Sequence, residues 1–98
     1  VEAPVAMLVG TDKSYPLKPG VNTFGRKPDN DVAIVDPYVS GRHGLIDVAE
    51  DGVYLTDVNS TNGTVLNDAR LTPSMRTKLS SDDVIRLGAL EFRVVVNA

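Results

Sequence analysis

The amino-acid sequence predicts an all-β fold, in which short antiparallel strands form a sandwich or a barrel. Apolar and polar residues alternate over stretches such as 45–48 and 53–58, which turns every second side chain toward a core. Clusters of Gly, Pro, Asn and Asp interrupt these stretches and supply the backbone geometry that tight turns need. Helical periodicity is nearly absent from the chain.

The first strands are expected where apolar alternation appears between turn clusters. The stretch 5–9 opens the series, and the Lys-Pro-Gly turn at 18–20 introduces a second strand at 21–25. The Pro-Asp-Asn sequence within 27–30 then leads to a third, short strand at 32–34.

The later strands follow the same pattern. Residues 43–48 and 53–58 are expected to be strands connected through the Glu-Asp-Gly turn at 50–52. The remaining expected strands are residues 64–66, 76–79, 84–87 and 90–96. The last is more apolar than the others, so we expect it to lie centrally in a sheet or to pair with the N-terminal strand.

Composition is typical of a single globular domain. The 98 residues are 42% hydrophobic and 23% charged, and a chain of this length can build one core. A formal net charge of −3 argues against general nucleic-acid binding, and the absence of Cys together with a single His argues against a metal site. We therefore expect no cofactor, no catalytic or metal residue, and no nucleic-acid partner.

The start of the chain shows neither a signal peptide nor a long apolar run. We expect no membrane insertion from this segment and a cytoplasmic, intracellular location. Residues 1–98 are interpreted as one domain excised from a longer protein, whose other parts are free to anchor it to a membrane.

Polar clusters at 25–27, 40–43 and 59–64 interrupt the apolar strands near their ends. Loops of a sandwich gather at its two ends, so clusters that are distant in sequence can form one surface. Their guanidinium, ammonium, hydroxyl and amide groups, with Gly for close backbone approach, are those of an oxyanion receptor. Taken singly, each cluster is better explained by ordinary turn chemistry, and it is the ordered set that favours a receptor.

The ordered set of motifs resembles the forkhead-associated (FHA) domain family. The motifs are Phe24-Gly25-Arg26, Ser40-x-x-His43 and Asp57-x-x-Ser60-Thr61-Asn62-Gly63-Thr64, followed by a matching segment at 83–88. The resemblance extends over residues 21–96. It implies a sandwich of two antiparallel sheets, with loops clustered at one end that bind a phosphothreonine in an extended peptide.

The resemblance also implies roles for individual residues. Arg26 would be the main phosphate ligand and Ser40 a second one, while Thr61 would contact the phosphate region and Asn62 the peptide main chain. The residues expected to support the site are Gly25, His43, Asp57 and Gly63, with His43 buried and neutral.

Three further positions lie within or next to these motifs, and each has its own interpretation. Gly41 stands where many family members have a polar or basic side chain, and it offers the phosphate only its backbone amide. Arg42 either replaces that contact or points the other way along the strand and contacts a peptide side chain. Lys27 either adds charge to the rim of the site or is simply solvated.

Other functions are weaker interpretations of the same residues. Ser40, His43 and Asp57 have the residue types of a hydrolytic triad, but no Gly-x-Ser-x-Gly sequence surrounds the serine, so no enzyme is expected. The main alternative is a sandwich that acts as a scaffold or oligomerisation domain without phosphate. We expect a monomer whose partner is a threonine-phosphorylated protein or peptide. An immunoglobulin-like sugar binder would need more aromatic residues than this chain has.

Overall fold

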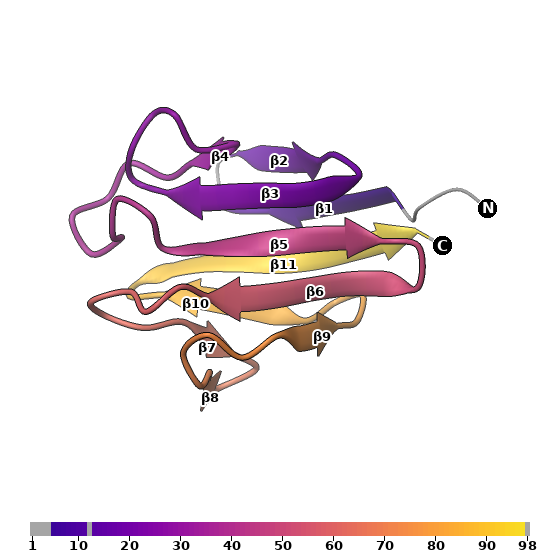
Figure 1. Cartoon of the computed structure of the whole chain (residues 1–98). Helices are drawn as coiled ribbons and strands as arrows, with labels where there is room; N and C mark the ends of the chain where they lie inside the picture. Colours follow the sequence, from indigo (N-terminus) through magenta and orange to yellow (C-terminus); the bar gives the residue numbers. More distant parts are fainter. Residues whose placement is uncertain (1–4, 12, 98) are drawn as a thin grey trace.

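The computed structural model describes residues 5–11 and 13–97, which form a sandwich of two β-sheets (Figure 1). One sheet has six strands in the order β2-β1-β11-β10-β7-β8, and the other has five in the order β4-β3-β5-β6-β9. The six-stranded sheet consists of β1 (Val5–Val9), β2 (Ser14–Leu17), β7 (Val65–Leu66), β8 (Ala69–Arg70), β10 (Val84–Leu87) and β11 (Leu90–Asn97). The five-stranded sheet consists of β3 (Gly20–Gly25), β4 (Val32–Ala33), β5 (Gly44–Ala49), β6 (Gly52–Asp57) and β9 (Thr77–Leu79).

The core lies between the sheets and follows from the alternation of apolar residues. In the β5–β6 hairpin, Ile46 pairs with Leu55 and Val48 with Val53, and all four side chains are buried. The facing sheet buries Ile85 and Phe92, which pair across β10 and β11. Burial of each such side chain contributes roughly 1.5–3 kcal/mol, so these pairs fix the register of both sheets.

The sequence predicted the sandwich and most of its strands, with two omissions and one difference in direction. Strands β2 and β8 were missed: Pro16 interrupts the alternation in β2, and β8 is only two exposed residues long. The predicted sheets were antiparallel throughout, whereas β4 pairs with β3 in parallel. The last strand satisfies both of its expectations, because β11 pairs with β1 and lies inside the six-stranded sheet.

The strand ends place three predicted clusters at one end of the sandwich. Strand β3 ends at Gly25 and β5 begins at Gly44, and these ends lie side by side because Phe24 pairs with Gly44. The end of β6 joins them, since Gly44 also pairs with Asp57. The β3–β4, β4–β5 and β6–β7 connections therefore lie together at the left of Figure 1, opposite the β5–β6 turn.

Within the described residues, no helix is long and apolar enough to cross a membrane.

Candidate functional site

Two backbone hydrogen bonds hold the first cluster against the second. The Arg26 amide donates to the Ser40 carbonyl at 2.9 Å, and the Lys27 amide donates to the Gly41 carbonyl at 3.3 Å. A Cβ atom added at Gly25 would collide with the carbonyl oxygen of Gly41. Glycine is therefore needed at position 25 because the two backbones approach so closely.

Gly25→Ala is expected to destabilise the fold by roughly 1–3 kcal/mol, because the added methyl must displace backbone rather than a flexible side chain. Equilibrium denaturation in urea measures this change. Gly20→Ala is a useful comparison for the steric effect, since nothing lies within 4 Å of a Cβ atom there. Its cost comes from its positive φ of 89° alone. Wild-type stability in Gly25→Ala would contradict the close approach.

The Ser40 hydroxyl is oriented by the third cluster. Its oxygen accepts a hydrogen bond from the Thr61 amide at 3.0 Å. No described residue accepts the hydroxyl proton of Ser40 or bonds the hydroxyl of Thr61. Both hydroxyls are therefore available as donors to an external acceptor. Ser40 is half-buried and Thr61 is exposed.

The His43 side chain connects the second and third clusters through hydrogen bonds of its ring. It is fully buried, its Nδ1 accepts a hydrogen bond from the Ser40 amide at 3.1 Å, and its Nε2 lies 2.9 Å from the Gly63 carbonyl. Because Nδ1 is an acceptor, the proton belongs on Nε2, which donates to Gly63 and leaves the ring neutral. The ring also stacks on Phe24 with centroids 5.8 Å apart. His43 is thus buried, as expected, and its ring connects the segments that contain Ser40 and Gly63.

Asp57 closes the loop that contains Thr61 and Asn62. Its carboxylate accepts hydrogen bonds from the Ser60 amide at 2.8 Å, the Ser60 hydroxyl at 2.6 Å and the Thr64 hydroxyl at 2.6 Å. Burial by itself would raise the pKa of Asp57, but the hydrogen bonds from Ser60 and Thr64, assisted by nearby His43, lower it below its ordinary value. The carboxylate is therefore ionised and structural.

The residue types of a hydrolytic triad do not form one. The Ser40 hydroxyl bonds the Thr61 amide, and it is the backbone of Ser40 that contacts the His43 ring. The other ring nitrogen of His43 is 3.9 Å from Asp57 and 2.9 Å from the Gly63 carbonyl. A nucleophile–base hydrogen bond is the feature such a triad requires. No group of three or more His, Asp or Glu side chains is placed to hold a metal among the described residues.

Asn62 forms two hydrogen bonds with Tyr38, a residue that was not predicted from the sequence. Its side-chain amide donates to the Tyr38 carbonyl at 2.7 Å, and the Tyr38 hydroxyl donates to the Asn62 carbonyl at 3.2 Å. An amide that donates one hydrogen bond keeps a second proton and its oxygen for other partners. Tyr38 is 40% exposed and lies in a loop without a recognisable motif. The one signal in the sequence was an aromatic residue close to Ser40.

The cations of the cluster differ in whether they are already paired. Arg42 donates to Asp29 at 3.0 Å and to Asn30 at 2.8 Å, so its guanidinium is engaged within the chain. The side chains of Arg26 and Lys27 are exposed and contact no carboxylate of the described residues. The structure thus brings Arg26, Lys27, Ser40 and Thr61 together, while the guanidinium of Arg42 is turned toward the β3–β4 loop.

Arg70 is a further cation beside the cluster that the sequence analysis did not identify. Its guanidinium lies over Gly63, where a Cβ atom would be 2.8–3.0 Å from Nη2, Cζ and Nε. Gly63 has a φ of 83°, which favours glycine, whereas the guanidinium is the end of a flexible side chain that can move aside. Arg70 belongs to β8, a short strand that the sequence pattern did not predict.

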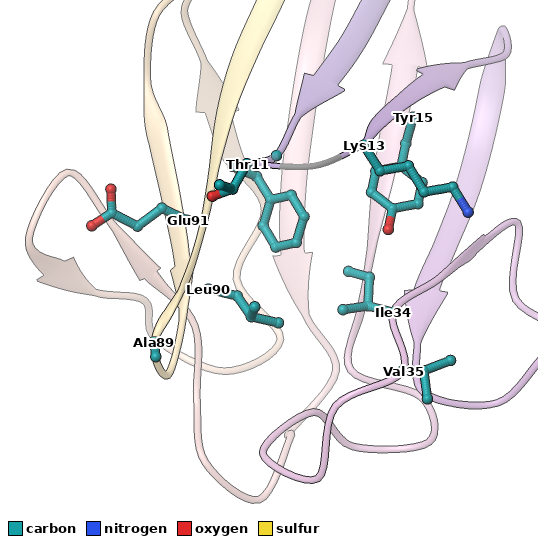
Figure 2. A pocket seen from close by; sticks show the side chains of 10 residues that line it. Thr11, Lys13, Tyr15, Ile34, Val35, Ala89, Leu90 and Glu91 are labelled. Carbon is teal, nitrogen blue, oxygen red and sulfur yellow. The ribbon is translucent and has the colours of Figure 1, made fainter.

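A separate pocket of about 200 Å³ opens at the same end of the sandwich (Figure 2). Leu90 and Ile34 point toward each other across it, and Lys13 and Glu91 lie at its margins. None of the residues that the sequence analysis assigned to the site lines this pocket. The loop cluster is therefore distinct from this pocket.

Comparison with known proteins identifies a family model and close structural neighbours. The FHA domain model matches residues 22–88. The chain is 40% identical over 87 residues to the FHA domain-containing protein FhaA of Mycobacterium tuberculosis. The aligned region covers 87% of this chain but only 16% of FhaA. The chain thus spans a small part of that relative.

Two solved structures share the fold over nearly the whole chain. One, from work on phosphothreonine-dependent FHA domain interactions, has a TM-score of 0.87 at 35% identity, covering 96% of this chain and 98% of the other. The other is the N-terminal FHA domain of Rad53p from Saccharomyces cerevisiae in complex with a phosphothreonine peptide. It has a TM-score of 0.87 at 26% identity, covering 95% of this chain and 94% of that one.

Proposed function

Because the chain belongs to the FHA domain family, we propose that it binds proteins or peptides that contain a phosphothreonine, with its loop cluster as the phosphate receptor. The observation that carries the proposal is the position of Arg26. Its unpaired guanidinium extends from a backbone that is bonded to Ser40, whose hydroxyl proton is free. A dianionic phosphate requires this combination of charge and hydroxyl donors.

The receptor is assembled from groups with free donors. Arg26 gives the phosphate a charge-assisted and bidentate contact, and the hydroxyls of Ser40 and Thr61 donate to its remaining oxygens. Asn62 keeps one amide proton and its oxygen for the peptide main chain. Because two loops are fixed by buried His43 and Asp57, these donors are held in place before the peptide arrives.

The domain is a binding module and catalyses no reaction in this proposal. One copy of the chain supplies the whole cluster, so a monomer is sufficient for recognition. We place the interaction inside the cell, because the phosphate on threonine is added from ATP. A scaffold that docks without phosphate is the alternative, and it gives no reason for unpaired Arg26 to lie beside the free Ser40 hydroxyl.

The experiment that tests the proposal compares one peptide in four forms by calorimetric titration at fixed salt. The phosphothreonine form is expected to bind, and the unphosphorylated form is not. Aspartate in place of phosphothreonine should bind at background level, since a carboxylate has a single charge and lacks the tetrahedral set of acceptors. The phosphoserine form should bind several-fold more weakly, because serine lacks the β-branch that restricts the side chain. Equal binding of the phosphorylated and unphosphorylated forms would favour the scaffold.

A further inference from the structure

We propose that Lys27 is a phosphate-pairing residue of this site, and that its side chain occupies the place that a side chain at position 41 would fill. This inference rests on the proposed function and adds to it a second cation. A Cβ atom at Gly41 would be 3.1 Å from Cε, 3.3 Å from Cγ and 3.4 Å from Cδ of Lys27. The aliphatic stem of Lys27 therefore lies along Gly41, and the ammonium group is one bond beyond its end.

The backbone of Lys27 is fixed on both sides. Its amide donates to the Gly41 carbonyl at 3.3 Å, while its carbonyl accepts hydrogen bonds from the Asn30 amide at 3.2 Å and the Asn30 side chain at 2.8 Å. Asn30 is buried and its side chain also donates to the Gly41 carbonyl at 2.8 Å. The Lys27 side chain thus starts from a rigid turn that is bonded to the residue following Ser40.

The charge of the phosphate exceeds what Arg26 alone can neutralise, so a second cation is needed in the loop cluster. A phosphorylated threonine has a charge of about −1.5 to −2 at neutral pH, and Arg26 neutralises about one unit of it. Arg42 is already neutralised by Asp29 at 3.0 Å, and Arg70 lies over Gly63 in the neighbouring loop. Lys27 contacts no described carboxylate and is the cation beside Ser40 that remains for the second charge.

The chain contains a matched control for the packing. Lys78 also lies over a glycine, with its Cε 2.9 Å from the position of a Cβ atom at Gly52. Gly52 begins β6 at the end of the hairpin opposite the loop cluster. Lys78 therefore reproduces the contact between a lysine stem and a glycine but has no Arg26 or Ser40 beside it.

The test titrates the phosphothreonine peptide and its unphosphorylated form into wild type, Lys27→Met, Lys78→Met and Arg26→Ala at two salt concentrations. Lys27→Met keeps the stem and loses the charge, so we expect about tenfold weaker binding of the phosphopeptide and a smaller effect of added salt. Lys78→Met should bind like wild type. Melting curves confirm that each variant is folded.

Moving the lysine from position 27 to position 41 provides the second test. Gly41 has no positive φ, and the three atoms nearest to a Cβ atom there all belong to the Lys27 stem. Shortening Lys27 to Ala therefore makes room for a side chain at position 41. The double variant Lys27→Ala with Gly41→Lys should regain most of the affinity that Lys27→Ala loses. Wild-type affinity in Lys27→Met, with binding lost in Arg26→Ala, would overturn the role of Lys27 and leave the proposed function standing. If wild type bound both peptide forms equally, the proposed function and this inference would fail together.

Discussion

Arg26→Ala is expected to abolish measurable phosphopeptide binding while the fold remains intact. Arg26 is exposed, and its guanidinium has no hydrogen bond or ion pair with the described residues. Removal of a charge-assisted contact that leaves the phosphate partly desolvated should cost roughly 2–5 kcal/mol, which moves a micromolar complex beyond detection. Stability should change by less than about 0.5 kcal/mol, since the side chain lies outside the core.

Calorimetric titration and thermal melting of both proteins with one phosphothreonine peptide measure these effects. Arg93→Ala is the matched control, because Arg93 is also exposed but pairs with Asp82 at 3.1 Å outside the loop cluster. Wild-type affinity should also weaken as pH falls through about 6, where the phosphate takes up its second proton. Near wild-type affinity in Arg26→Ala would require phosphate-independent docking instead.

The convergence of the loop cluster could be predicted from sequence because it depends on strand ends. Alternation locates where β3 ends and β5 begins, and a sandwich then brings Gly25 and His43 to the same end. The polarity of the residues at those ends indicated an anion site. Which donors are free could not be predicted, since that depends on side-chain partners such as Asp29 for Arg42.

The features that the sequence analysis missed have a common physical cause. Tyr38 bonds Asn62 across 24 positions of sequence, and Arg70 covers Gly63 from a strand of two residues. Neither contact produces a local pattern. The parallel pairing of β4 with β3 was missed for a related reason: alternation shows which face of a strand is buried but not its direction relative to its neighbours.

The second large effect is expected from Asp57→Ala, which should destabilise the domain by roughly 3–5 kcal/mol. The substitution removes the acceptor for three hydrogen bonds, from the Ser60 amide, the Ser60 hydroxyl and the Thr64 hydroxyl. Thr64 is fully buried, so its hydroxyl loses its partner without gaining water. Phosphopeptide affinity should fall too, because Ser60 accepts from the Gly63 amide at 3.0 Å and thereby orders the loop that contains Thr61 and Asn62.

The pH dependence distinguishes loss of the charged network from loss of packing. Because the folded state lowers the pKa of Asp57 below its ordinary 3.8, the ionised network contributes its full stability above that value and loses it as pH falls through the lowered pKa. The stability difference between wild type and Asp57→Ala should be constant near neutrality and shrink below about pH 4. Asp31, whose pKa the hydrogen bond from Lys18 lowers to about 2, titrates in both proteins and cancels in the difference. Urea denaturation at a series of pH values measures the difference in the free energy of unfolding between the two proteins. If that difference stayed constant down to pH ~2, the destabilisation by Asp57→Ala would come from lost packing alone.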